Sequence, residues 1–74
     1  MKLALTGATG FLGSHLAEAL RRGGHEVKLL VRSRDKARRI LERRGVWPLE
    51  TVVGDMADAA AVAALLDGCD AAVH

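Results

Sequence analysis

Short apolar runs alternate with segments of helical periodicity along the whole chain, and glycines follow each helical segment. The apolar runs are too short for helices and are followed by glycine or polar residues, which is typical of strands buried on both faces of a parallel sheet. The helical segments repeat their apolar residues at intervals of three and four. This pattern predicts strands at residues 2–6, 26–31, 49–53 and 70–73.

The three helices have recognisable starts and stops. The first covers residues 11–22, the second follows Ser33, and the third covers residues 59–66 after Asp58. Ser33 and Asp58 carry short oxygen-bearing side chains that can accept from the free N–H groups of a first helical turn. Glycines that allow a sharp turn end the helices, and they stand at Gly23–Gly24, Gly45 and Gly68.

The order of elements is therefore β-α-β-α-β-α-β. Strands that alternate with helices are joined by right-handed crossovers, which produce a parallel sheet with helices on its faces. The chain belongs to the α/β class, and the expected strand order is 3-2-1-4, half of a doubly wound fold. No linker or repeat divides residues 1–74, so we expect one unit.

Composition and charge exclude several kinds of partner. Hydrophobic residues make up 50% and aromatic residues 3% of the chain, so the core must be aliphatic. The net charge of +2 can attract a phosphorylated ligand, but so few aromatic residues to stack bases disfavour a nucleic-acid partner. The first apolar run is too short to span a membrane or to form a signal peptide, and we expect a cytoplasmic protein with no membrane partner. The single cysteine and three scattered histidines show no metal-ligand spacing.

The stretch LALTGATGFLG carries the first chemical signal. A strand that runs straight into a helix brings the free N–H groups and partial positive charge of the helix to the end of the strand, which suits a phosphate. Gly7 permits the tight turn, Gly10 lets a phosphate approach the backbone, and Gly13 lets the helix pack closely on the strand. Thr9 adds a hydroxyl. The spacing is GxxGxxG rather than GxGxxG, and a tight turn without a ligand is the alternative interpretation.

The end of the second strand suggests which dinucleotide would bind. An acidic residue at this place would hold the ribose 2′-hydroxyl of NAD, but the sequence has VRSR, with Arg32, Ser33 and Arg34. A guanidinium makes a forked, charge-assisted contact with phosphate. The stretch therefore favours the 2′-phosphate of NADP, with NAD as the alternative. Arg32 and Arg34 can also be read as solvated loop charges.

The stretch VVGDMAD follows the third strand. A carboxylate at Asp55 can accept from the adenine amino group while the N–H of Met56 bonds to a ring nitrogen. The alternative is that Asp55 only shapes the turn, and Asp58 is read as a helix cap.

These stretches resemble the short-chain dehydrogenase/reductase superfamily, in particular its extended and atypical members. Those include nucleotide-sugar epimerases and dehydratases, dihydroflavonol-reductase-like enzymes and NmrA-like proteins. The matching stretches are TGATGFLGSHLAEAL, LLVRSRDKA, VVGDMAD and GCDAAVH, which together cover most of the chain. The resemblance implies the N-terminal part of a Rossmann dinucleotide-binding domain. It places the backbones of Thr9, Gly10, Phe11 and Leu12 along the pyrophosphate, Arg32 at the 2′-phosphate, and Asp55 with Met56 at the adenine.

The chain departs from the superfamily in its catalytic residues. The family uses a YxxxK motif, and this sequence contains no tyrosine. No catalytic residue is therefore assigned; His15 and Cys69 have no base or partner beside them in sequence. We expect a truncated cofactor half of an oxidoreductase or an epimerase- or dehydratase-like enzyme. The alternative is a non-catalytic NADP-sensing or protein-interaction module. The fourth strand should form an exposed sheet edge, which predicts a homo-oligomer.

Overall fold

The computed structural model describes residues 1–7 and 10–73, with Phe11 described by its backbone alone. Four parallel strands form one sheet in the order β3-β2-β1-β4. The α/β fold and the predicted strand order are confirmed. The strands are β1 (Lys2–Thr6), β2 (Glu26–Val31), β3 (Glu50–Val53) and β4 (Ala71–Val73).

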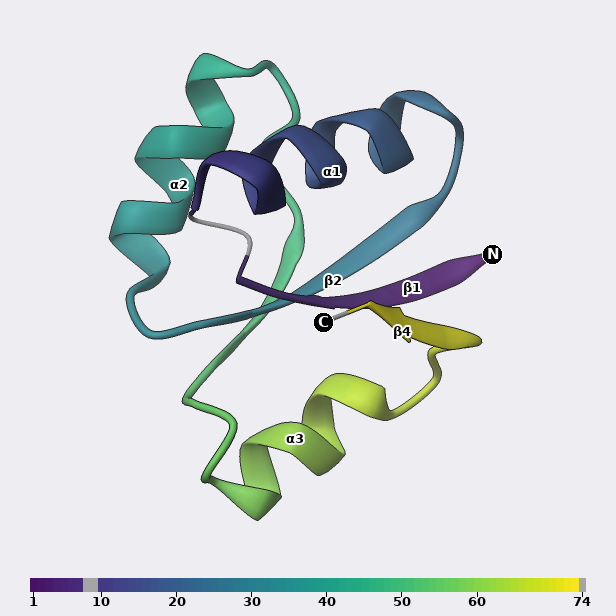
Figure 1. The fold of residues 1–74 in the computed structure, drawn as a ribbon, viewed down its shortest axis with the longest axis vertical. Helices are drawn as coiled ribbons and strands as arrows, with labels where there is room; N and C mark the ends of the chain where they lie inside the picture. Colours follow the sequence, from purple (N-terminus) through teal and green to yellow (C-terminus); the bar gives the residue numbers. More distant parts are fainter. Residues whose placement is uncertain (8–9, 74) are drawn as a thin grey trace.

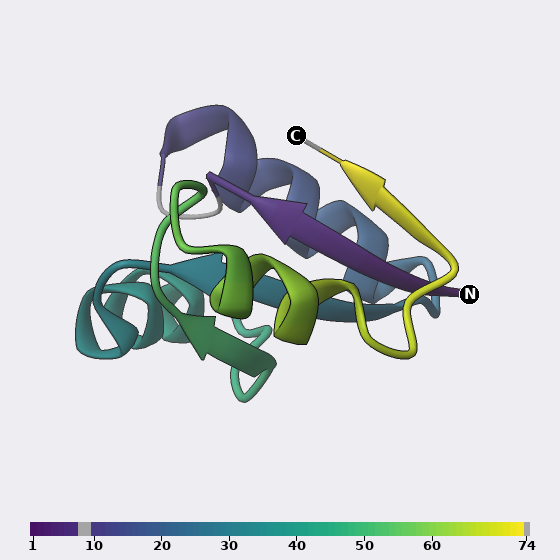
Figure 2. The ribbon, with the colours of Figure 1, turned by 90° about the horizontal axis from the view of Figure 1, so that it is seen from below.

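Three helices cover the two faces of this sheet (Figure 1). Helices α1 (Phe11–Arg22) and α2 (Arg34–Arg43) lie on one face, and α3 (Ala59–Leu66) lies on the other. Figure 2 views the molecule from the α3 side, with α1 and α2 behind the sheet. Because all strands are parallel, every helix begins at the edge of the sheet where the strands end.

Two strands begin one residue later than predicted. Leu49 precedes β3 and is buried in the core instead of pairing with β2. Asp70 precedes β4, where its N–H donates to the Lys2 carbonyl at 2.7 Å and its carboxylate accepts from the Lys2 N–H at 2.7 Å. These two bonds attach the start of β4 to β1.

The predicted helix caps are present. The Ser33 hydroxyl accepts from the Lys36 N–H at 3.2 Å, and the Asp58 carboxylate accepts from the N–H groups of Ala60 and Ala61 at 3.0 and 3.1 Å. The turns after the helices contain glycines with positive φ, namely Gly24, Gly45 and Gly68. Local sequence therefore determines where the helices begin and end.

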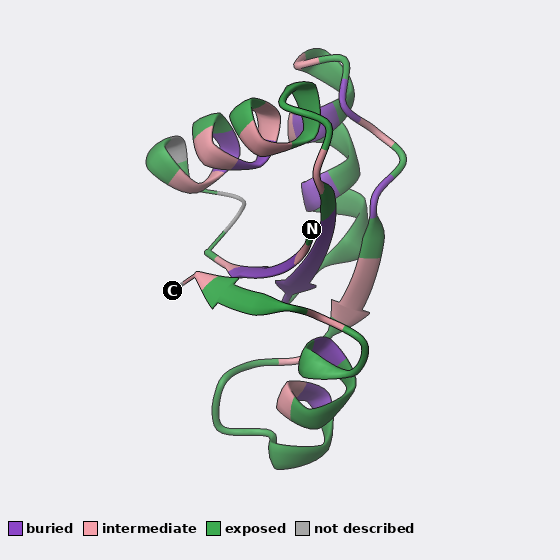
Figure 3. Cartoon of the chain, turned by 90° about the vertical axis from the view of Figure 1, so that its right-hand side faces the viewer, coloured by how far each residue is buried: buried purple, intermediate pink, exposed green. Residues whose placement is uncertain are grey.

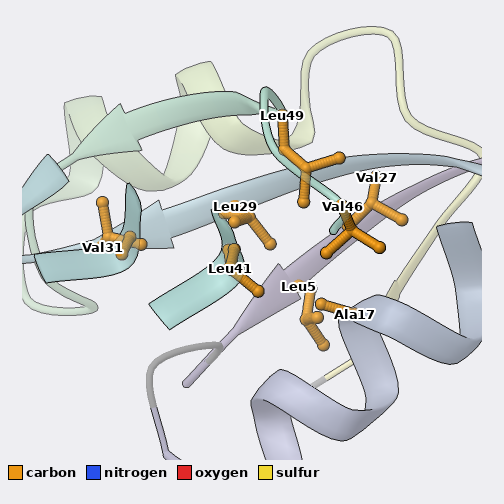
Figure 4. Packing of buried hydrophobic residues seen from close by; sticks show 9 residues of the cluster. Leu5, Ala17, Val27, Leu29, Val31, Leu41, Val46 and Leu49 are labelled. Carbon is orange, nitrogen blue, oxygen red and sulfur yellow. The ribbon is translucent and has the colours of Figure 1, made fainter. Parts of the chain in front are cut away.

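The core consists of two aliphatic layers, one on each face of the sheet. Successive residues of a strand point to opposite faces, so Leu5 and Leu29 face α1 and α2 while Ala4 and Leu30 face α3. Figure 4 shows the larger layer, in which Leu41 of α2 and Ala17 of α1 lie over β1 and β2. In the smaller layer Ala4 and Leu30 pack with Ala61 and Leu65.

Lys28 lies in the middle of the sheet, and its side chain is only 8% exposed. Its ammonium donates to the carbonyls of Ala64 and Asp67 at the end of α3, the latter at 3.2 Å, and lies 3.4 Å from the Glu50 carboxylate. A cation at a helix C-terminus satisfies carbonyls that have no intrahelical partner. Lys28 therefore anchors α3 to β2.

Strand β4 forms an edge of the sheet, and its residues Ala71 and Ala72 are exposed (Figure 3). Within the described part of the chain, no helix has the length and apolar character needed to cross a membrane.

Candidate functional site

A hollow of about 430 Å³ lies where β1, β2 and β3 end. In an open parallel sheet this edge is where ligands bind, because helix N-termini and loop residues converge there. The residues that line it come from the ends of all three strands and from the first turn of α2: Thr6, Gly7, Leu30, Val31, Arg32, Ser33, Lys36, Gly54, Asp55 and Met56.

Gly7, the first residue of the glycine turn, lies with Thr6 on the β1 side of this hollow. Gly7 has a φ of +69°, a conformation that favours glycine, and its carbonyl accepts from the Gly10 N–H at 3.2 Å. Gly10 is extended, and among the described residues a Cβ placed on it would meet the Gly7 carbonyl oxygen alone, at 3.6 Å. Thr9 lies outside the described residues, and so does the side chain of Phe11.

The first turn of α1 differs from those of α2 and α3. Side chains cap the other two helices, whereas the N-cap of α1 is Gly10, which has no side chain to accept from the first-turn N–H groups. A phosphate oxygen can take this place, since it is an acceptor and carries negative charge. Leu12 and Gly13 belong to this turn; the Leu12 side chain is 80% exposed.

The β2 side of the hollow is basic. Arg32 and Ser33 line it, and Lys36 joins them from the first turn of α2. The Ser33 hydroxyl accepts from the Lys36 N–H and keeps its own hydrogen for a ligand. Sequence reasoning missed Lys36, although a basic residue one turn after Arg32 was a usable signal. Arg34 lies elsewhere, with its guanidinium carbon 5.2 Å from the centre of the Trp47 ring.

Asp55 and Met56 form the β3 side. One Asp55 carboxylate oxygen accepts from the Ala57 N–H at 2.8 Å, and the Asp55 carbonyl accepts from the Asp58 N–H at 3.1 Å. Asp55 therefore does shape the turn, yet its carboxylate retains a second oxygen that can accept from a ligand. Met56 is 52% exposed beside it.

The perturbed titrating groups lie away from the hollow. A hydrogen bond from Arg22 lowers the pKa of Glu18, with Arg44 contributing in the same direction. A hydrogen bond between Lys2 and Glu50 raises the pKa of the lysine and lowers that of the glutamate. None of the residues in these two ion-paired groups lines the hollow, so we assign them to the stability of the fold.

His15 and Cys69 have structural partners. His15 Nδ1 lies 3.2 Å from an Arg44 guanidinium nitrogen, and the Cys69 thiol donates to the Leu65 carbonyl at 3.2 Å. Across residues 1–7 and 10–73, no group of three or more His, Cys, Asp and Glu side chains is arranged to hold a metal ion.

The family model described as NAD(P)H-binding matches residues 7–74. The chain is 40% identical over 75 residues to the ceramide reductase of Caulobacter vibrioides, and this alignment covers 97% of the chain and 22% of that enzyme. It is 54% identical over 33 residues to an epimerase-family protein of Bacillus subtilis, covering 45% of this chain and 11% of that protein. The crystal structure of vestitone reductase from alfalfa aligns with a TM-score of 0.77 and 26% identity, over 96% of this chain and 23% of that one.

The chain belongs to the NAD(P)H-binding family, and its fold and relatives place it within the extended short-chain dehydrogenase/reductase superfamily. The cofactor of this family is a nicotinamide dinucleotide. The chain spans between 8% and 24% of the length of the curated relatives it matches.

Proposed function

We propose that this chain binds NADP(H) in preference to NAD(H). The observation that carries the proposal is the basic end of β2, where Arg32, Ser33 and Lys36 line one side of the hollow. Each can donate to the oxygens of a 2′-phosphate, and two of them carry positive charge. Asp55, the one carboxylate among the lining residues, lies at the end of β3 instead.

The other parts of the cofactor are assigned to the first turn of α1 and to the β3 side of the hollow. The pyrophosphate would bind at the first turn of α1, where Gly10 leaves the N–H groups without a capping side chain. The adenine would lie beside Asp55 and Met56, with the free carboxylate oxygen of Asp55 accepting from the 6-amino group. This chain's residues bind and orient the cofactor, and the nicotinamide supplies the hydride chemistry.

We further propose that the chain is the cofactor half of an oxidoreductase or of an epimerase- or dehydratase-like enzyme. The support is the set of relatives, which includes reductases and epimerase-family proteins that are more than four times as long. On this proposal the substrate is a carbonyl compound or a nucleotide sugar, and residues outside these 74 bind it and transfer its proton.

The cofactor proposal is tested by calorimetric titration of the folded chain with NADP, NAD and 2′-phospho-AMP. NADP should bind more tightly than NAD, and Arg32→Ala should weaken NADP at least about tenfold, as expected for a lost charge-assisted hydrogen bond. NAD binding should change little. Arg34→Ala is the matched control, because Arg34 lies over Trp47 and should leave the preference intact. Equal affinity for NADP and NAD in the wild-type chain would contradict the proposal.

We also propose that the 74-residue chain self-associates through β4. The strand is an edge of the sheet, and an unpaired edge can accept a strand from a second copy. Sedimentation equilibrium should detect a dimer or larger species, and Ala71→Lys should shift it toward monomer, because lysine on an edge strand opposes pairing. A wild-type chain that stays monomeric at high concentration would rule this out.

A further inference from the structure

We propose that helix α3 is a positioning element of the site: the contact between Gly54 and Ala61 holds Asp55 in place and so sets the selectivity for adenine. This inference rests on the proposed binding of NADP. Neither Gly54 nor Ala61 needs to touch the adenine for the proposal to hold.

The contact is unusually close. A Cβ built on Gly54 would lie 2.6 Å from the Cβ of Ala61, a separation that two carbon atoms do not tolerate. Ala61 is buried at 6% exposure and packs with Ala4, Leu30 and Leu65 between α3 and the sheet. The absence of a side chain at Gly54 therefore determines how closely the first turn of α3 approaches the end of β3.

A hydrogen bond to the neighbouring strand β2 also fixes the position of Gly54. Its N–H donates to the carbonyl of Val31 in β2 at 2.9 Å, so the peptide cannot retreat from α3 without breaking a bond to the neighbouring strand. Leu30, which lines the hollow, lies 3.9 Å from the same Cβ position.

Asp55 is linked to α3 by hydrogen bonds. Its carboxylate and carbonyl accept from the N–H groups of Ala57 and Asp58, and Asp58 in turn caps α3 through the N–H groups of Ala60 and Ala61. The segment from Asp55 to the start of α3 forms one connected turn, which Figure 1 shows between β3 and α3. A displacement of the helix must therefore be passed to Asp55.

Gly54→Ala is the direct perturbation. To restore an ordinary carbon–carbon separation the two Cβ atoms must move apart by about 1 Å. A shift of that size lengthens a hydrogen bond beyond its useful range. The Gly54→Ala,Ala61→Gly double variant removes one methyl group as it adds the other, so it should restore the approach.

The readout is the ratio of affinities for NADP and for its hypoxanthine analogue, measured by calorimetry. Hypoxanthine carries a carbonyl where adenine carries the 6-amino group, so its 6-position accepts hydrogen bonds and cannot donate to the Asp55 carboxylate. The wild-type chain should prefer NADP by about tenfold, and Asp55→Asn should remove the preference. Gly54→Ala should remove it too, whereas the double variant should regain it and Ala61→Gly alone should keep it.

If a folded Gly54→Ala chain still prefers NADP to its hypoxanthine analogue, the inference is overturned. It is also overturned if the wild-type chain binds NADP but shows no preference for adenine. If Gly54→Ala does not fold, as judged by circular dichroism, the double variant decides: a folded double variant without the preference also overturns the inference. A wild-type chain that binds neither NADP nor NAD contradicts the proposed function itself, which is a separate outcome.

Discussion

Gly7 and Gly10 are three residues apart in the chain, and the structure predicts that alanine lowers the stability at Gly7 but leaves it nearly unchanged at Gly10. Gly10 has a φ of −77°, which any residue adopts, and among the described residues its added Cβ would make one ordinary contact, 3.6 Å from the Gly7 carbonyl oxygen. Gly10→Ala should therefore fold normally. Alanine lowers the entropy of the unfolded chain, which stabilises this variant by about 0.4–1 kcal/mol. Alanine is also a poorer N-cap residue than glycine, and this loss offsets a similar amount of free energy.

Gly7→Ala should lose stability instead. Its Cβ would meet no described residue within 4 Å, but the φ of +69° is unfavourable for alanine. The expected loss is about 1–2 kcal/mol in the free energy of unfolding. Urea denaturation followed by circular dichroism separates the two variants, because only Gly7→Ala should lower the midpoint markedly.

Gly10→Ala should weaken the binding of NADP even though it leaves the stability nearly unchanged. Its new methyl group would stand at the place proposed for the pyrophosphate, at the first turn of α1. Losing a hydrogen bond to a charged group should weaken NADP binding about tenfold or more. Adenosine 2′-monophosphate is the internal control, because it has no 5′-phosphate and should bind Gly10→Ala as it binds the wild type. A folded Gly10→Ala chain with wild-type affinity for NADP would refute the assignment of the pyrophosphate to this turn.

Three further predictions concern stability. Lys28→Met keeps the apolar stem but removes the ammonium that caps α3, and urea denaturation should show a loss of about 2–4 kcal/mol in the free energy of unfolding. The control Glu50→Gln removes the charge of the ion-pair partner and should lose much less. An equal loss in the two variants would assign the effect to the ion pair instead of the cap. Asp58→Ala should lower the stability by about 1 kcal/mol in the same assay through the lost α3 cap; no loss would contradict the cap. Because the pKa of Glu18 is lowered in the folded state, its stabilisation is complete above its ordinary 4.5 and is lost as the pH falls below it. Urea midpoints measured from neutral to acidic pH should therefore fall less in Glu18→Gln than in the wild type, and parallel curves would contradict this.

The sequence by itself determined the order of elements, the helix caps and the sheet topology. Ser33 and Asp58 cap helices because each bonds to N–H groups two or three residues away, which is a local interaction. The strand order follows from alternation and from the right-handed crossover, which leave little choice of topology. The same topology brings the ends of three strands together, so five of the ten residues that line the hollow, Arg32 and Asp55 among them, could be predicted without coordinates.

Only the tertiary structure decided which side chains meet across long separations. Arg34 follows Arg32 by two residues, yet it lies over Trp47 because the packing of the segment after α2 brings the indole within its reach. Lys28 stands in an apolar run, and its role depends on where α3 ends on the opposite face of the sheet. The contact between Gly54 and Ala61 likewise depends on how closely a helix approaches a strand. Periodicity records which face of an element is apolar, but the distance between two elements is settled only when all their side chains are packed together.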